Sequence, residues 1–381
     1  MLNNLSLILL SAGESSRFKI PVKKQWLRIG EKPLWLTVLN RFENMGIFSK
    51  IVLTAHRDEV ALFQNFTDIE IIAGGDSRQN SIKNAISNIE TEFVVISDIA
   101  RCLIPKDVLN RLIENRHLGD IIVPYLPVSD TVVVGENSVD RDSVKLIQTP
   151  QISKTEILQN LLNSENSEFT DESSLFVANG YKRYFVLGDK KAEKLTYISD
   201  ITSSDCFKKP VSEKITVGNG FDVHQFEIDG SPLKLGGVII DTPLTFKAHS
   251  DGDVLIHSLI DSILGASSLG DIGEMFPDSN EKYRGADSTE LLKYVKTIIT
   301  KIGIQIEHID ITVIAEIPRL KDYKITIQKK LSEVLNIPKY SINIKATTTE
   351  KLGFIGRKEG VAVLSTATLK YIDWRNLLNE S

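Results

Sequence analysis

The chain has 381 residues, of which 42% are hydrophobic and 25% are charged, as in an ordinary soluble protein. This length exceeds one typical hydrophobic core, so two domains are expected. The net charge of −5 argues against a broad surface for nucleic acid or anionic membranes. It leaves room for local basic pockets that bind phosphates.

The cysteine content and the start of the chain indicate where the protein works. Two cysteines, Cys102 and Cys206, make no disulfide framework, which suits the reducing cytosol. The apolar run 5–10 is too short to span a membrane, and no basic residue precedes it as in a signal peptide. We therefore expect a cytoplasmic protein with no membrane or nucleic-acid partner, and a buried first strand at 5–10.

The first 200 or so residues alternate between strand and helix patterns. The predicted strands and helices, in chain order, are strand 5–10, helix 34–43, strands 50–55 and 69–73, helix 77–89 and strand 93–97. Alternation of this kind is typical of a mostly parallel sheet that is covered on both faces. In such sheets ligands bind beyond the carboxyl ends of the strands.

A polar stretch at 204–213 is the expected linker between a domain at 1–203 and a second domain at 214–373, which an eight-residue tail, 374–381, follows. The second domain mixes strands and helices. Its predicted strands are 214–219, 309–315, 341–346 and 361–368, and its predicted helices are 253–267, 288–303 and 325–335. The alternating apolar residues of the closing strand predict an antiparallel partner.

Polar loops follow three strands of the first domain. The small residues of 11–17 have backbone N–H groups suited to a polyphosphate, and Arg17 and Lys24 supply positive charge. Gly74-Gly75 allows close approach to a nucleotide, and Asp98 is a carboxylate suited to Mg²⁺. Each loop alone is weak evidence, because paired glycines are usually just a turn and a lone Arg or Lys is usually a solvated side chain. Their recurrence at successive strand ends predicts one nucleotide site on one rim.

Three residues of the second domain have metal-ligand spacing. Asp222 and His224 point to the same face of a strand, and His257 lies one helical turn after Asp253. Three such ligands leave one position of a tetrahedral Zn²⁺ open, as in a catalytic site. The alternative is a solvated strand end plus a core histidine, which explains each residue alone but not the set.

Over residues 1–203 the chain resembles the 2-C-methyl-D-erythritol 4-phosphate cytidylyltransferases. The resemblance rests on these motifs: Ser11-Ala-Gly with Arg17 and Lys24-Gln25, Gly74-Gly75-x-x-Arg78-x-x-Ser81, Asp98-x-Ala-Arg101, Asp130-Thr131, Arg141 and Thr149-Pro-Gln151. It implies a Rossmann-like domain that transfers a cytidylyl group from CTP, with Mg²⁺, to a sugar-alcohol phosphate and releases pyrophosphate. The residues implied in nucleotide binding are Ala12, Gly13, Gly74, Gly75, Arg78, Ser81, Asp98, Ala100 and Arg101.

The same resemblance implies roles in the transfer itself. Arg17 and Lys24 would stabilise the attacked α-phosphate, while Thr131, Arg141 and Lys194 would position the acceptor.

The chain also departs from this family's pattern. Ser15 stands where the loop usually has a glycine, and Lys23 stands where Pro-Lys-Gln has its proline, with Pro21 nearby. The usual His-Asp-Ala-Ala-Arg-Pro reads Ser97-Asp-Ile-Ala-Arg-Cys. Two alternatives stay open: the first domain is a non-catalytic nucleotide-binding scaffold, or it uses another sugar phosphate. The presence of Arg17, Lys24, Asp98 and Arg141 favours catalysis over a scaffold. Thr131, Arg141 and Thr149-Pro-Gln151 favour the erythritol phosphate.

Residues 214–372 are similar to the 2-C-methyl-D-erythritol 2,4-cyclodiphosphate synthases. The motifs that carry this similarity are Gly220-Phe-Asp-Val-His224, Ala248-His-Ser-Asp-Gly-Asp253, His257, Leu269-Gly-Asp271-Ile-Gly273, Phe276-Pro-Asp278 and Lys345-Ala-Thr-Thr-Thr-Glu350-Lys-Leu-Gly-Phe354. The similarity implies an α/β domain in which a phosphate of CDP-methylerythritol 2-phosphate attacks the β-phosphorus, closes a cyclic diphosphate and expels CMP.

The roles implied for this second reaction divide into four groups. Zn²⁺ held by Asp222, His224 and His257 would anchor a phosphate, and Mg²⁺ near Glu350 would bridge the diphosphate. His249 and Thr348 would steady the transition state. The residues expected to bind the sugar and its phosphate are Ser250, Asp271, Gly273, Phe276 and Asp278. The residues expected near the cytidine are Ala315, Pro318, Leu320, Lys321, Thr347, Thr349, Glu350, Phe354 and Arg357.

The resemblance also implies partners. The cytidylyltransferases form dimers and the synthases form trimers with active sites between subunits, so a fusion that satisfies both would close as a hexamer. The pathway kinase that acts between the two reactions has no candidate here, because no Gly-x-x-x-x-Gly-Lys-Ser/Thr loop occurs. Association with that kinase as a separate protein, with or without transfer of intermediates, is an open expectation.

Overall fold

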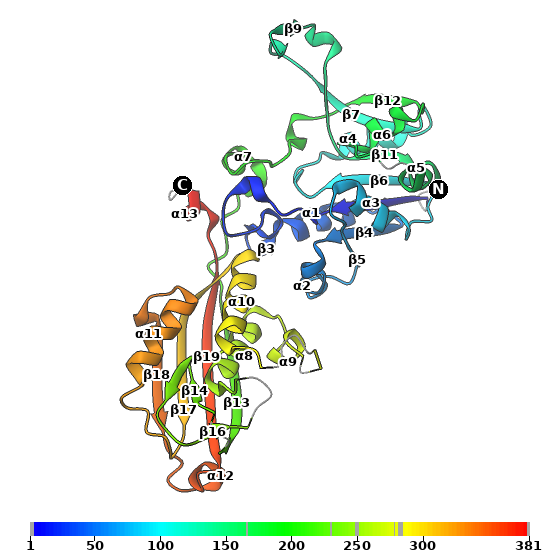
Figure 1. The fold of residues 1–381 in the computed structure, drawn as a ribbon. Helices are drawn as coiled ribbons and strands as arrows, with labels where there is room; N and C mark the ends of the chain where they lie inside the picture. Colours follow the sequence, from blue (N-terminus) through cyan, green and yellow to red (C-terminus); the bar gives the residue numbers. More distant parts are fainter. Residues whose placement is uncertain are drawn as a thin grey trace. The chain divides into compact units, whose positions relative to one another are not determined.

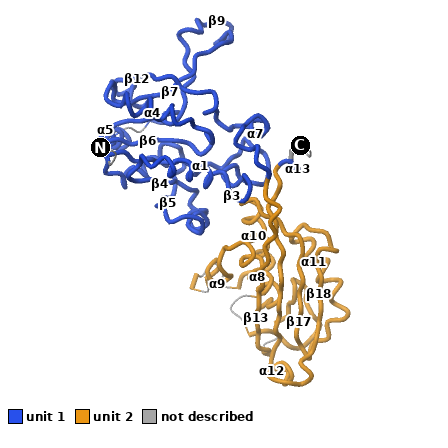
Figure 2. The backbone as a smooth tube through the Cα atoms, turned by 180° about the vertical axis from the view of Figure 1, so that it is seen from behind, with its two compact units in different colours: residues 1–210, 375–381 blue, residues 211–374 orange. Residues whose placement is uncertain are grey.

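The computed structural model describes residues 4–164, 167–228, 231–247, 251–277, 279–280 and 285–378. The chain divides into two compact units, residues 1–210 with 375–381 and residues 211–374 (Figure 2). None of the helices in the described ranges combines the length and the apolar composition that crossing a bilayer needs. Each unit is described below by itself.

The first unit is built on an eight-stranded sheet in the order β10-β7-β11-β6-β1-β4-β5, with β12 paired to β7 (Figure 1). Four neighbouring strands of this sheet run parallel to one another: β1 (Leu5–Leu10), β4 (Lys50–Ala55), β5 (Glu70–Ala73) and β6 (Phe93–Asp98). The remaining strands are β7 (Ile121–Pro127), β10 (Lys145–Ile147), β11 (Gln151–Lys154) and β12 (Arg183–Leu187). The predicted, mostly parallel sheet is confirmed, and β11 is antiparallel to both of its neighbours.

Helices cover both faces of this sheet, as predicted from its apolar strands. Ile8 belongs to a core with Ile82 of α3 and Leu158 of α5, whereas the alternate residue Leu9 is buried on the opposite face. The helices of the first unit are α1 (Leu34–Glu43), α2 (Val60–Gln64), α3 (Arg78–Ile86), α4 (Lys106–Glu114), α5 (Thr155–Ser164), α6 (Glu172–Ala178) and α7 (Ser199–Ser203).

Small elements complete the first unit. The short hairpins are β2 (Arg28–Ile29) with β3 (Lys32–Pro33), and β8 (Val132–Val134) with β9 (Asn137–Val139). The β8–β9 hairpin projects from the sheet of this unit (Figure 1). Within the predicted linker, residues 205–207 form a short 3₁₀ turn in which Cys206 and Phe207 are buried.

The second unit has a five-stranded sheet in the order β16-β13-β19-β17-β18. Its strands are β13 (Ile215–Glu227), β16 (Thr245–Phe246), β17 (Ile304–Ile314), β18 (Ile342–Thr347) and β19 (Gly360–Tyr371), with a separate hairpin of β14 (Leu233–Leu235) and β15 (Val238–Ile240). As predicted, the closing strand β19 is antiparallel to its partners, β13 and β17. The helices are α8 (Val254–Ser267), α9 (Ile272–Met275), α10 (Ser288–Lys301), α11 (Lys324–Leu335) and α12 (Gly353–Gly356). The last helix, α13 (Trp374–Leu378), belongs to the first unit from residue 375 onward.

The predicted strand 214–219 was too short, because β13 continues to Glu227 and carries Asp222 and His224 within it. Its inner face has Gly218 and Gly220 where a strand pattern normally has large apolar residues. A Cβ on Gly220 would lie 1.9 Å from the carbonyl oxygen of Ser258, so the backbone of α8 packs directly on the strand. Close packing therefore removes the hydrophobic alternation that would have marked the strand.

Candidate active sites

A cavity of about 570 Å³ opens at the carboxyl ends of β1, β4, β5 and β6. The predicted site residues that line it are Ala12, Gly13, Arg17, Lys24, Gly74, Gly75, Ser81, Arg78, Asp98, Ala100 and Lys194. The three loops that the sequence placed on one rim therefore meet at one cavity. This volume lies in the usual range for a small-molecule site.

The Gly74-Gly75 segment lies tightly against the first loop. A Cβ on Gly74 would come within 2.4 Å of the Cβ of Ala12 and 2.9 Å of the Ser81 hydroxyl. The backbone N–H of Gly75 donates to Ser81 Oγ at 3.1 Å. Glycine is thus needed here to bring the two loops together, besides any approach of a ligand.

Asp98 is the buried acidic centre of the cavity. Its carboxylate pairs with Arg78 Nε at 3.3 Å and with Lys194 Nζ at 3.0 Å, and it accepts a hydrogen bond from Thr149 Oγ1 at 3.2 Å. Burial alone would raise the pKa of Asp98, but the charges of Arg78 and Lys194 hold that pKa well below its usual range. Arg78 also pairs with the buried Glu172 of α6. The carboxylate is therefore ionised and orients two cations at the edge of the cavity.

Lys24 presents an ammonium group of unusual acidity. Burial, followed by the charges of Lys194 and Arg17, lowers the pKa of Lys24 to about 8, although Asp98 opposes this shift. Its Nζ donates to the carbonyl oxygen of Leu195 at 2.9 Å. Lys24, Lys194 and Arg17 thus lie around one cavity, where their positive charges repel one another. A bound anion would offset this repulsion.

Two of the three departures from the family pattern, Ser15 and Lys23, are structurally accommodated. Ser15 has φ 57° and ψ 25°, the left-handed region that favours glycine. Its hydroxyl accepts from the backbone N–H of Lys24 at 3.1 Å and donates to Gln25 Oε1 at 3.0 Å. Lys23 is buried and pairs with Glu59 at 2.7 Å and with Glu14 at 3.0 Å. These bonds offset the strain of the loop.

Three predicted residues of the first unit do not line this cavity. Arg101 is buried behind it, where Nε donates to Thr149 Oγ1 at 2.9 Å and Nη1 to the carbonyl oxygen of Ala192 at 2.6 Å. Thr131 and Arg141 flank the exposed β8–β9 hairpin, and Arg141 donates to the carbonyl oxygen of Ser129 at 2.9 Å. Their predicted roles in positioning the acceptor stay predictions.

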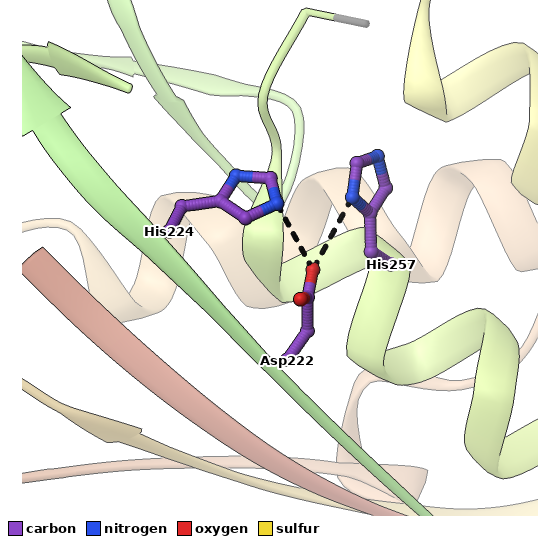
Figure 3. Close-up of side chains that lie close together, drawn as sticks. All are labelled: Asp222, His224 and His257. Carbon is purple, nitrogen blue, oxygen red and sulfur yellow. Dashed lines mark ion pairs between the residues drawn. The ribbon is translucent and has the colours of Figure 1, made fainter. Parts of the chain in front are cut away.

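The second unit brings Asp222, His224 and His257 together as predicted (Figure 3). The Oδ2 atom of Asp222 lies 3.2 Å from His224 Nε2 and 3.3 Å from His257 Nδ1. One atom from each residue lies within 4.8 Å of the other two. Asp222 and His224 come from β13 and His257 from α8, and all three side chains point to a common centre.

Hydrogen bonds behind the histidines fix which ring nitrogens face the centre. His224 Nδ1 lies 2.9 Å from the carbonyl oxygen of Gly252, and His257 Nε2 lies 3.0 Å from Ser288 Oγ. Ser288 in turn donates to Asp251, whose other oxygen pairs with Lys234 at 3.0 Å. Such outer contacts orient metal-ligating imidazoles.

The chemistry of this donor set fits a divalent metal ion. A carboxylate and two imidazole nitrogens are ligands that Zn²⁺ accepts, and three protein ligands leave a position for substrate. Burial alone would raise the pKa of Asp222, but hydrogen bonds from His224 and His257 hold that pKa well below its usual range. The carboxylate is therefore ionised, which is the form in which it binds a metal. The Asp222, His224 and His257 cluster can hold a metal.

The predicted sugar-binding loop lies after α8. Asp271 caps α9 by accepting from the backbone N–H of Glu274 at 2.9 Å, and Gly273 lies within that short helix. Phe276 is buried against Tyr294. His249, Ser250 and Asp278 lie outside the described residues, so their predicted roles stay predictions.

The predicted cytidine segments lie together at one end of the sheet. The backbone N–H of Ala315 donates to the carbonyl oxygen of Thr347 at 3.0 Å, and Thr348 Oγ1 donates to Glu350 at 2.8 Å. This region also contains exposed Phe354, buried Leu320 and exposed Lys321. The strand register puts Thr347 of β18 at the same end of the sheet as His224, three strand spacings away, about 14 Å, and Ala315 follows β17, one strand nearer to His224.

The remaining predicted cytidine residues add two further observations. Arg357 is exposed and pairs with Glu359 at 2.8 Å, while Thr349 Oγ1 donates to the carbonyl oxygen of Leu352 at 2.7 Å. Pro318 follows the end of β17 and is partly buried. The turn that contains Arg357 leads into β19, whose first residues Gly360 and Val361 pair with Gln225 and His224.

Sequence reasoning missed several residues that support the sites. Glu59, Glu172 and Ser288 stand in no motif, and their partners are distant in the chain. Ser288 had one weak signal, because it opens a predicted helix; Glu59 and Glu172 had none.

Comparison with known proteins assigns a family to each part of the chain. The family model described as 2-C-methyl-D-erythritol 4-phosphate cytidylyltransferase matches residues 5–209, and the YgbB family model matches residues 215–370. The chain is 48% identical to a bifunctional enzyme IspD/IspF of Sulfurimonas denitrificans, over 99% of this chain and 97% of that protein. It is also 48% identical to the one from Campylobacter jejuni subsp. doylei, over 99% of this chain and all of that protein.

The fold supports the same assignment. The solved structure of the bifunctional IspDF from Campylobacter jejuni has a TM-score of 0.86 and 48% identity, and the match covers 98% of this chain and 100% of that one. The chain therefore belongs to the bifunctional IspD/IspF family, whose members join a 2-C-methyl-D-erythritol 4-phosphate cytidylyltransferase to a cyclodiphosphate synthase in the methylerythritol phosphate pathway.

Proposed function

We propose that CTP binds in the 570 Å³ cavity of the first unit and that Arg17 and Lys24 carry the cytidylyl transfer. The observation that carries this proposal is that Lys24, Lys194 and Arg17 all line the cavity. Burial, followed by the charges of Lys194 and Arg17, lowers the pKa of Lys24 to about 8. Such a cluster suits a triphosphate and the extra negative charge of its transition state.

Catalysis of the cytidylyl transfer depends on positioning the two substrates and on stabilising the negative charge of the transition state. A phosphate oxygen of 2-C-methyl-D-erythritol 4-phosphate attacks the α-phosphorus of CTP, the bond to the β-phosphate breaks and pyrophosphate leaves. Lys24 and Arg17 would neutralise the charge that grows on the α-phosphate oxygens. The nucleotide would be held by the backbone of residues 11–17 and by the Gly74-Gly75 segment, with Arg78, Ser81 and Ala100 beside it.

We propose that the acceptor's phosphate lies near Lys194, which already forms part of the cavity. Thr131 and Arg141 flank a hairpin that projects from the unit, with Val133 55% and Val134 65% exposed. They would reach an acceptor in a second copy of the chain, which fits the dimers expected for this family. Arg101 would act from behind, by holding Thr149 against Asp98.

Mg²⁺ would enter this site with CTP. Asp98 is a suitable ligand, but it is already engaged by Arg78 and Lys194. Mg²⁺ commonly takes one carboxylate together with phosphate oxygens and water. We therefore propose that the phosphates of CTP supply most of its ligands.

The first reaction can be tested by ³¹P NMR of the purified chain with CTP, 2-C-methyl-D-erythritol 4-phosphate and Mg²⁺. Signals of pyrophosphate and a CDP-alcohol are expected. Intact CTP beside a working cyclisation would make the first unit a nucleotide-binding scaffold. Turnover with a different sugar phosphate, in a panel of acceptors, would instead assign the unit another substrate.

For the second unit, we propose that the ion held by Asp222, His224 and His257 is Zn²⁺. The support is geometric: a carboxylate oxygen and two ring nitrogens converge, and each ring is fixed from behind. When bound, Zn²⁺ would anchor and polarise a substrate phosphate. Mg²⁺ near Glu350 is proposed to bridge the diphosphate.

The remaining residues of this reaction are assigned by resemblance and by location. His249 and Thr348 would hydrogen-bond to the phosphates in the transition state. Asp271, Gly273, Phe276, Asp278 and Ser250 would hold the methylerythritol. The cytidine would lie against the segment at 315–321 and the loop that contains Thr347, Thr349, Glu350, Phe354 and Arg357.

The distance of about 14 Å between Thr347, at the end of β18, and His224 bears on assembly. We propose that one copy supplies the metal ligands and its neighbour supplies the cytidine segments. The outer face of β13 suits such an interface, because Ile215, Val217 and Phe221 are each 60% exposed. Trimeric synthase units, joined through dimers of the first unit, would make a hexamer.

Phe221→Asp tests this assembly, because a carboxylate cannot be buried in an apolar interface without a partner. Light scattering should show smaller particles, and cyclisation should fail while cytidylyl transfer continues. An unchanged mass with full cyclisation would contradict the interface. Association with the intervening kinase is proposed too, and pull-down with the purified kinase tests it.

A cytoplasmic location is proposed for both reactions. Cys102 and Cys206 are both free thiols, as expected in a reducing compartment. Fractionation of cells followed by immunoblotting checks this location.

A further inference from the structure

A buried ion pair lies at the base of the loop that carries Lys24. Lys23 is 7% exposed and Glu59 is 4% exposed, and their Nζ and Oε1 atoms lie 2.7 Å apart. Burying two charges is favourable only when they are paired and hydrogen-bonded. Glu59 precedes α2, which places its carboxylate beneath the loop.

The Glu59 carboxylate also binds the two residues that follow Lys24. Its Oε2 atom accepts from Gln25 Nε2 at 3.2 Å and from Trp26 Nε1 at 3.4 Å. Gln25 is 1% exposed and Trp26 is 0% exposed, so neither side chain has water to bind instead. One carboxylate therefore holds the residue before Lys24 and the two residues after it.

Gln25 extends this set of bonds into the first loop. Its Nε2 also donates to the carbonyl oxygen of Gly13 at 3.2 Å, and its Oε1 accepts from Ser15 Oγ at 3.0 Å. Ser15 Oγ accepts in turn from the backbone N–H of Lys24 at 3.1 Å. The two segments that present Arg17 and Lys24 to the cavity are thereby tied to each other and to Glu59.

We propose that Glu59 is a positioning residue for cytidylyl transfer, because it anchors the segment 23–26 and so sets the location of the Lys24 ammonium. The proposal rests on the role of Lys24 given above. In this chain Lys23 stands where the family usually has a proline, whose ring would stiffen the segment covalently. In this chain the ion pair between Lys23 and Glu59 restrains the same segment electrostatically.

Glu59→Gln tests the proposal. The amide keeps the shape but presents a single acceptor, so Lys23, Gln25 and Trp26 cannot all be satisfied. A misplacement of about 1 Å costs on the order of 10²-fold in rate, so kcat of cytidylyl transfer should fall by about that factor. The KM for CTP should change much less, because the other cations and the backbone still bind the triphosphate.

Two controls separate positioning from loss of stability. Cyclisation by the second unit of the same chain should keep its rate. Leu62→Ala removes a buried hydrocarbon side chain from α2, three residues after Glu59. The leucine side chain makes no hydrogen bond, so the bonds that hold the loop are kept. The substitution should lower the melting temperature and leave kcat near the wild-type value.

A second variant keeps the test decisive if Glu59→Gln does not fold. Lys23→Met with Glu59→Met removes both charges and keeps most of the volume, so no lone charge is buried. It should fold and still show the lower kcat, since Gln25 and Trp26 have lost their acceptor. Wild-type kcat in this variant or in Glu59→Gln, or a loss no larger than in Leu62→Ala, overturns the proposal.

Lys24→Ala distinguishes this proposal from the one on which it rests. Full activity of Lys24→Ala would remove the role of Lys24 and the positioning role of Glu59 with it. Loss of activity in Lys24→Ala beside wild-type kcat in both Glu59 variants would leave the role of Lys24 intact and overturn only the role of Glu59.

Discussion

At the scale of single residues, the first active site is governed by repulsion between cations. Lys24, Lys194 and Arg17 share one cavity, and Asp98 is the buried carboxylate that partly offsets them. The site therefore favours an anion, and its sensitivity to pH near neutrality comes from Lys24, whose pKa burial and the neighbouring cations lower to about 8.

The lowered pKa of Lys24 predicts a pH limit for cytidylyl transfer. Lys24 is charged below its pKa of about 8 and neutral above it, so kcat/KM for CTP should fall as pH rises through about 8. The measurement is the pH profile of kcat/KM with Mg²⁺ held constant. Lys24→Arg keeps its charge throughout, and its profile should lack this limb. An identical limb in both proteins would assign the titration to another group.

At the metal-ligand cluster, the Ser288 hydroxyl lies behind His257. Ser288→Ala removes the contact of this hydroxyl with His257 Nε2 and so weakens the restraint on the orientation of the imidazole. Affinity for Zn²⁺ should fall about 10- to 100-fold, measured by competition with a chromophoric chelator. The matched control is Ser262→Ala, because Ser262 Oγ is also buried in this unit but donates to the carbonyl oxygen of Leu259 in its own helix. Equal affinities in the two variants would contradict the role of Ser288.

At the scale of elements, the metal-ligand cluster depends on how α8 lies on β13. Gly218 and Gly220 let the helix backbone approach the strand, which brings His257 to Asp222 and His224. Ser258 Oγ then donates to the carbonyl oxygen of Gly220 at 3.0 Å. The two ligand elements are thus joined by contact between backbones rather than by large side chains.

Gly220→Ala should separate these elements. Its Cβ would lie 1.9 Å from the carbonyl oxygen of Ser258, so α8 must move, at a cost of about 1–3 kcal/mol in the stability of the second unit. Zn²⁺ affinity and cyclisation should both drop, while cytidylyl transfer persists. Gly265→Ala is the control, because its nearest neighbour would be 4.0 Å away. Unchanged Zn²⁺ affinity in Gly220→Ala would disprove the packing argument.

At the scale of the whole molecule, each of the two units has its own site. The residues of the first cavity all lie in the unit formed by 1–210 and 375–381, and the metal-ligand cluster lies in 211–374. The contacts described for the first cavity involve no residue of 211–374, and those described for the metal-ligand cluster involve no residue of 1–210.

Independence of the two units predicts that single changes separate the reactions. His257→Ala should abolish bound Zn²⁺ and cyclisation but leave cytidylyl transfer intact. Lys24→Ala should lower cytidylyl transfer by about 10²–10³-fold and leave cyclisation intact. Both rates are measured on the same preparation. Loss of both activities in either variant would mean that the units depend on each other.

Much of this protein follows from local sequence patterns. The strand β1 and the helix α1 begin and end at the predicted residues, because apolar runs of the right period identify buried strands and helix faces. The i and i+2 spacing placed Asp222 and His224 on one face, and polar loops after successive parallel strands predicted a shared rim. These inferences need only the periodicity of the backbone.

Tertiary structure alone decided the rest. Glu59 reaches Lys23, Gln25 and Trp26, and Ser288 reaches His257, across long stretches of chain. The full length of β13 was hidden because glycines that admit α8 interrupt its apolar pattern. A buried charge or hydroxyl acquires its partner only when distant segments pack. Periodicity shows which face of an element is buried, whereas the partners of a side chain depend on how the elements are packed together.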